Sequence, residues 1–128
     1  MQIHQSAEDY LETILMLNQR MGRVRSIDVV NELGYTKASV SIAMKKLREN
    51  GYIAVDGEGN LTLLEPGREI AERIYSRHRL LTHFFVQLGV DEEIAAEDAC
   101  KAEHILSEQT LKKIREYALL HDAQDSVK

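Results

Sequence analysis

Three side chains that commonly bind metal ions lie within five positions, in the stretch DACKAEHILS at residues 98–107. Cys100 offers a thiolate, Glu103 a carboxylate and His104 an imidazole, and each is a competent ligand for a divalent transition metal. Positions i, i+3 and i+4 of a helix project to one side. The spacing therefore allows a metal site. It equally allows a helix with a small buried thiol, an exposed acid and an unconnected histidine.

Two other segments offer further ligands. Asp9 and Glu12 have i, i+3 spacing, and His78 shares an apolar helical stripe with Ala71, Ile74, Tyr75, Leu81 and Phe85. Three helices could thus bring oxygen, nitrogen and sulfur donors to one place. Each residue also has an ordinary role: helix capping for Asp9, a solvated acid for Glu12, and a hydrogen-bonded core histidine for His78. Spacing alone favours these ordinary roles.

The elements that must position these side chains are mostly helices, because Ala, Leu, Ile and Glu are plentiful and only one proline is present. Apolar periodicity predicts helices at residues 6–20, 26–33, 37–50, 66–88, 91–106 and 107–121. Ser6, Ser26, Thr36 and Ser107 are the predicted N-caps of four of them. The alternating pattern of YIAVDGEGNLTLLE predicts a β-hairpin at residues 52–65. The last seven residues are expected to form a disordered tail.

Composition places the chain among cytoplasmic proteins. Its 128 residues suffice for one compact domain or two small ones. The single cysteine excludes an intrachain disulfide and fits a reducing cytosol. No segment approaches the roughly 20 apolar residues that a membrane helix needs, and the N-terminus lacks a signal pattern. We expect a soluble cytoplasmic protein without a membrane partner.

Charge is distributed unevenly along the chain. The net charge is −5, yet residues 20–55 carry seven Lys/Arg against three Asp/Glu, a balance of +4. Residues 91–128 carry five against ten, a balance of −5. A basic segment on an acidic chain suggests that one part meets a polyanion and another does not.

The basic segment has the element order of a winged helix-turn-helix, namely two short helices, a tight glycine turn between them and a hairpin. The helix at 37–50 buries Val40, Ala43, Met44 and Leu47 and presents its other faces to DNA. The alternative is a helical domain whose exposed lysines only solvate it. The wing at residues 57–60 has acidic neighbours, so we expect little phosphate contact there. Predicted DNA contacts are Arg23, Arg25, Thr36, Lys37, Ala38, Ser39, Ser41, Lys45 and Lys46.

The combination resembles the diphtheria-toxin-repressor and manganese-transport-regulator family of metal-dependent repressors. The resemblance lies in EDYLETIL, KASVSIAMKKLRENGY, LTLLEPGREIAERIYSRHRLL, LGVDEE and DACKAEHILS. It implies a mainly α fold with a winged helix-turn-helix domain at 1–65 and a helical metal-binding and dimerisation domain at 66–128, without the SH3-like domain of many members. It also implies a homodimer on a palindromic DNA operator, a divalent metal as co-repressor, and neither an enzymatic activity nor an organic ligand. The ligands it implies are Asp9, Glu12, His78, Cys100, Glu103 and His104.

Two departures from the family patterns bear on the metal. Manganese sensors of the family have a glutamate where this chain has Cys100, and iron sensors have a methionine where it has Asp9. Carboxylates suit Mn²⁺, whereas a thiolate attracts Fe²⁺, Co²⁺ or Zn²⁺. We predict Mn²⁺ ahead of Fe²⁺ by a small margin, with Co²⁺, Zn²⁺ or Cd²⁺ able to substitute and one or two ions per subunit. The alternatives are a metal-independent regulator that senses an organic ligand, a small metallohydrolase and a structural zinc protein.

Overall fold

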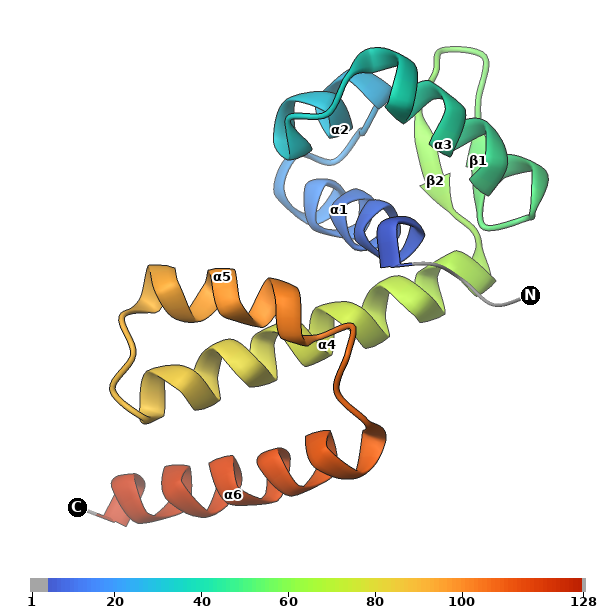
Figure 1. The fold of residues 1–128 in the computed structure, drawn as a ribbon. Coiled ribbons are helices and arrows are strands. Elements are labelled where there is room, and N and C mark those ends of the chain that lie inside the picture. The colour runs from blue at the N-terminus through green and yellow to red at the C-terminus, as the bar shows by residue number, and fades with distance from the viewer. Residues whose placement is uncertain (1–4, 128) are drawn as a thin grey trace. The chain divides into compact units, whose positions relative to one another are not determined.

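The computed structural model describes residues 5–127, which form six helices and one two-stranded sheet (Figure 1). The described residues group into two compact units, one ending at Arg73 and the other beginning at Ile74, so α4 contributes to both. The elements are α1 (Gln5–Met21), α2 (Ser26–Leu33), α3 (Lys37–Glu49), β1 (Ile53–Val55), β2 (Leu61–Leu63), α4 (Glu65–Gln87), α5 (Glu92–Ala102) and α6 (Glu108–Val127).

In the first unit, α1, α2, α3 and the hairpin enclose an apolar core. Gly34 ends α2 with a left-handed φ of 72°, and its N–H donates to the Val30 carbonyl oxygen at 2.8 Å. Thr36 then caps α3, because its Oγ1 accepts from the Ser39 N–H at 3.1 Å. The predicted helix-turn-helix and its cap are thereby confirmed. The fully buried core side chains include Leu11, Ile14, Val24, Val29, Val40 and Ile53.

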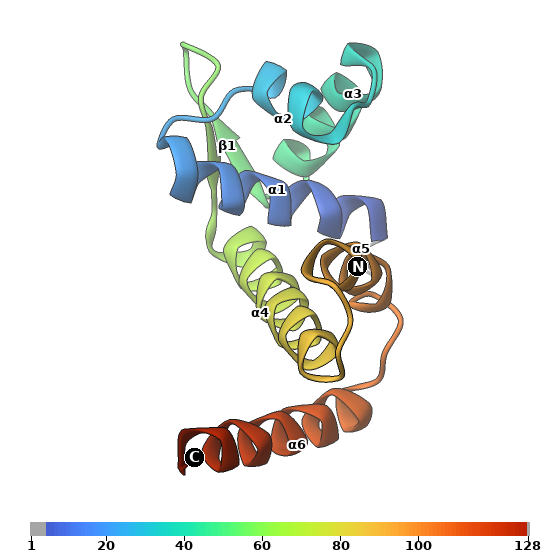
Figure 2. The ribbon, with the colours of Figure 1, turned by 90° about the vertical axis from the view of Figure 1, so that its left-hand side faces the viewer.

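Strands β1 and β2 form an antiparallel hairpin in which Ile53 pairs with Leu63 and Val55 with Leu61. The Oδ1 atom of Asp56 accepts from the backbone N–H groups of Glu58 and Asn60, each at 2.9 Å. Beyond the strands, the turn stands clear of α2 and α3 as a wing (Figure 2). The Asp56 carboxylate therefore stabilises the turn itself.

Gly67 lets the start of α4 approach the preceding chain closely. A Cβ at this position would lie well inside van der Waals distance of the Tyr52 carbonyl oxygen. We predict that Gly67→Ala destabilises the first unit by about 2 kcal/mol, since overpacking outweighs the better helix propensity of alanine. Urea unfolding would measure it. The control is Gly57→Ala, where an added Cβ meets nothing within 4 Å; a Gly67→Ala protein as stable as this control would refute the prediction.

In the second unit, the later part of α4 packs with α5 and α6. Leu81, Ala99 and Leu111, one from each helix, are buried together, and Leu106 and Ile114 pack against them. Among the described residues, no helix is long and apolar enough to cross a membrane.

Two predicted N-caps and two predicted helix ends were wrong. Helix α1 begins at Gln5 and α2 begins at Ser26, so Ser6 and Ser26 lie inside the first turns of these helices and do not cap them. Helix α5 ends at Ala102 rather than at residue 106, because the chain turns there before Ser107 caps α6 through the Thr110 N–H at 3.2 Å. Helix α6 continues to Val127, where a disordered tail was expected.

Candidate metal centre

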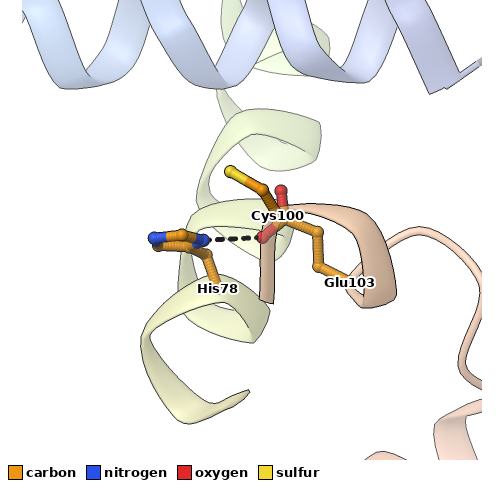
Figure 3. Close-up of side chains that lie close together, drawn as sticks. All are labelled: His78, Cys100 and Glu103. Atoms are coloured by element: carbon orange, nitrogen blue, oxygen red, sulfur yellow. Dashed lines mark hydrogen bonds and ion pairs between the residues drawn. The ribbon is translucent and has the colours of Figure 1, made fainter. Parts of the chain in front are cut away.

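Three of the predicted ligands converge within the second unit. His78 comes from α4, Cys100 from the last turn of α5, and Glu103 from the residue that follows this helix (Figure 3). One ligand atom of each lies within 4.8 Å of the others. Because metal–ligand bonds are about 2.0–2.3 Å long, two ligand atoms on the same ion can lie up to about twice that distance apart. The separations among the three donors are close to this limit, so the donors fit one divalent ion.

The carboxylate of Glu103 is the centre of this arrangement. Its Oε2 lies 3.0 Å from His78 Nδ1, and its Oε1 lies 3.4 Å from His104 Nε2. The side chain of Glu103 is 0% exposed and that of His104 is 1% exposed. A fully buried carboxylate is costly unless a cation or hydrogen-bond donors compensate its charge. Glu103 therefore has one oxygen directed to each of two imidazoles.

The pKa of His78 is raised to about 10, first by its hydrogen bond with Cys100 and next by its hydrogen bond with Glu103; burial acts in the opposite direction. In the metal-free chain this imidazole is therefore protonated at neutral pH. The raised pKa stabilises the fold fully below pH 6.5, and this contribution is lost as the pH rises towards 10.

A metal ion must displace the His78 proton, because only the neutral imidazole is a ligand. We predict that metal binding near pH 7.5 releases one proton from His78, and this proton by itself contributes a roughly tenfold rise in affinity per pH unit below the pKa of His78. Calorimetry in two buffers of different ionisation enthalpy would count the protons. The His78→Gln protein should release one proton fewer than the wild type, and an equal count in both proteins would contradict the prediction.

Arg77 contacts the segment that connects α5 to α6, next to this centre. Its Nη1 donates to the backbone carbonyl oxygen of Glu103 at 3.2 Å, and its Nη2 pairs with the Glu108 carboxylate. Its side chain is only 14% exposed, so the contact is partly shielded from solvent. Sequence reasoning did not single out Arg77, because nothing in the local pattern indicates a contact 26 residues away.

We predict that Arg77→Met lowers metal affinity about 10- to 100-fold, the range seen when groups that orient ligands are removed. The physical reason is that Glu103 would lose the donor that holds its backbone. Metal titration by calorimetry would measure the loss. Arg79→Met on the same helix is the matched control, and Arg77→Lys should recover part of the affinity. Equal affinity in the Arg77→Met and Arg79→Met proteins would rule out the positioning role.

The structure places the predicted ligands in different surroundings. Cys100 is exposed, so the interpretation of this thiol as a small buried apolar residue is wrong. His104 lies beyond the end of α5 and meets Glu103 without joining the cluster of His78 and Cys100. Asp9 and Glu12 belong to α1 in the first unit, and their role as ligands stays a prediction.

The predicted DNA contacts lie on exposed parts of the first unit. On α3, every predicted contact from Lys37 to Lys46 is exposed. Arg23 is exposed and lies 3.8 Å from Glu58 of the wing, a separation at which an exposed ion pair contributes little. Ile42 is also exposed on α3, although it was not among the predicted DNA contacts. Its place outside the predicted apolar stripe of this helix indicates the exposure from the sequence alone.

Two family descriptions cover nearly the whole chain. Residues 2–61 match the iron-dependent repressor N-terminal DNA-binding domain, and residues 64–120 match the iron-dependent repressor metal-binding and dimerisation domain. An uncharacterised HTH-type transcriptional regulator of Methanocaldococcus jannaschii is 35% identical over 113 residues, which cover 87% of this chain and 90% of that protein. The HTH-type transcriptional regulator MntR of Bacillus subtilis is 32% identical over 123 residues, covering 96% and 87%.

Solved structures agree with these matches. A manganese-dependent transcriptional repressor in complex with manganese superposes with a TM-score of 0.80 and 28% identity; the match covers 88% of this chain and 52% of that one. The chain thus spans about half the length of that repressor. The winged helix-turn-helix, the two family matches and the relatives together define a metal-dependent transcriptional repressor rather than an enzyme. The chain belongs to the iron-dependent repressor family, which includes the diphtheria-toxin repressor and the manganese-transport regulators, and the predicted resemblance is confirmed.

Proposed function

We propose that this chain represses genes of manganese or iron homeostasis, with Mn²⁺ ahead of Fe²⁺ as the co-repressor. The observation that carries this proposal is the buried Glu103 carboxylate, which lies between two imidazoles and within 4.8 Å of a thiol and an imidazole ligand atom. A divalent cation would neutralise this carboxylate. The Mn²⁺ preference is supported by the three carboxylates of the proposed ligand set and by a relative that was solved with manganese.

The full proposed ligand set is drawn from both units of the chain. Asp9 and Glu12 belong to the DNA-binding unit, whereas the other four belong to the dimerisation unit: His78, Cys100, Glu103 and His104. Six ligands exceed what one tetrahedral site needs, so two ions per subunit are accommodated. Residues from both units holding the same ion would fix one unit against the other. In a homodimer this would place the two α3 helices about 34 Å apart, one turn of a palindromic operator.

The remaining proposals follow from this mechanism. Metal and operator would stabilise the same conformation, so each would tighten binding of the other by the same factor. Neither an organic ligand nor a membrane has a part in it, and the protein acts in the cytoplasm. Co²⁺, Zn²⁺ and Cd²⁺ would occupy the same ligands when supplied in place of the physiological ion.

Metal titration under anaerobic conditions, followed by selection of duplexes from a random DNA pool, tests the proposal. With Mn²⁺ or Fe²⁺ at cellular free concentrations we expect enrichment of palindromic sites, and with a chelator none. Comparison of Mn²⁺, Fe²⁺ and Zn²⁺ at these concentrations assigns the co-repressor. Equal enrichment with chelator would contradict a metal-dependent mechanism, and enrichment of single half-sites would contradict a symmetric dimer.

A further inference from the structure

Ile42 is an exposed apolar side chain at the middle of α3. Val40, Met44 and Leu47 bury one face of this helix, whereas Ile42 is 58% exposed. At 3.6 residues per turn, Ile42 lies about 200° around the helix from Val40, on the opposite face. Single exposed apolar residues are common on protein surfaces, so exposure alone has no functional meaning. The position and the neighbours of Ile42 carry the inference.

The neighbours of Ile42 suit a polyanion. Ala38 precedes it by one turn, and Lys45 and Lys46 follow it at i+3 and i+4, all of them exposed on the same side. Glu49, the only acidic residue of α3, lies two turns after Ile42, at the C-terminal end of the helix. The two ammonium groups suit phosphate contacts, and the small side chain of Ala38 allows close approach. Ile42, between them, has no group that can form a hydrogen bond.

We propose that Ile42 selects thymine by contacting its C5-methyl group in the major groove. This inference rests on the proposed function, because it requires α3 to be the helix that enters the groove. The thymine C5-methyl is the largest apolar group on the major-groove edges of the four bases, since cytosine has only a C–H at this position. The hydrogen-bond donors and acceptors on these edges would lose water against Ile42 without gaining a partner. The geometry of α3 thus makes Ile42 a specificity-determining residue.

The test replaces thymines by deoxyuridine, which keeps base pairing and the O4 acceptor and removes only the methyl group. The duplex is the site enriched by the Mn²⁺-loaded chain, with each thymine replaced singly. We expect at least one position per half-site where replacement weakens wild-type binding about fourfold, as expected for one buried methyl group. The Ile42→Ala protein should bind the thymine and deoxyuridine duplexes with equal affinity.

The matched control is Ile27→Ala, which makes the same change at an exposed isoleucine of α2. This protein should keep the wild-type penalty for deoxyuridine. An enriched site that is insensitive to every replacement, or an Ile42→Ala protein that keeps the full penalty, would overturn the role of Ile42 while leaving the proposed function intact. Failure to enrich any duplex with either Mn²⁺ or Fe²⁺ would overturn the proposed function, and the role of Ile42 with it.

Discussion

Replacing Glu103 with glutamine should lower the affinity of the chain for Mn²⁺ by more than about 100-fold, beyond the range typical for groups that only orient ligands. The carboxylate is fully buried, and its two oxygens lie 3.0 Å from His78 Nδ1 and 3.4 Å from His104 Nε2. Glutamine keeps the shape of the side chain but removes the negative charge and one of the two oxygens. Both imidazoles would therefore lose the carboxylate that they share.

Calorimetric titration with Mn²⁺ measures this effect, and circular dichroism checks that the protein folds. The matched control is Glu97→Gln, which makes the same change at an exposed position of α5. It should retain wild-type affinity. A folded Glu103→Gln protein that binds Mn²⁺ as tightly as the Glu97→Gln protein would show that Glu103 is not a ligand.

Cys100→Ser should change which metals the chain prefers. The thiolate favours softer ions, so its loss should weaken Zn²⁺ and Co²⁺ binding at least about tenfold more than Mn²⁺ binding. The fold should be little affected, because Cys100 is exposed. Competition titrations among the three ions would measure the change in preference. An unchanged order and ratio of affinities in the variant would contradict a ligand role.

The chain contains a single cysteine, which provides an independent check of this prediction. In the metal-free wild type the exposed Cys100 thiol should react with iodoacetamide, and Zn²⁺ should protect it. Labelling at the same rate with and without Zn²⁺ would show that the thiol does not bind this metal.

The fold was largely predictable where local signals exist. The Thr36 cap, the Gly34 turn and the alternation around the wing each depend on neighbouring residues, and all three were confirmed. The end of α5 was not predictable, because residues 103–106 contain neither glycine nor proline to indicate a break. The turn is instead favoured by tertiary packing, since Leu106 packs against Leu81 and Leu111.

The candidate site was likewise predictable only where a local sequence signal exists. The apolar stripe of α4 predicted that His78 points inward, and its side chain is 18% exposed. That Glu103 rather than His104 joins His78 and Cys100 depends on where α5 ends. The contact of Arg77 with the Glu103 backbone depends on how α4 packs beside the following turn. The membership of the cluster and the contact of Arg77 therefore depend on interactions between segments distant in the sequence, which the spacing of residues cannot predict.

The most direct test of the account measures the affinity of the chain for Mn²⁺ twice, once alone and once bound to its selected operator. If metal and DNA stabilise the same conformation, operator should tighten Mn²⁺ binding by a factor of about 5–150, and Mn²⁺ should tighten operator binding by the same factor. The Glu103→Gln protein should show no coupling. Equal Mn²⁺ affinity with and without operator in the wild type would contradict the claim that the metal is a co-repressor.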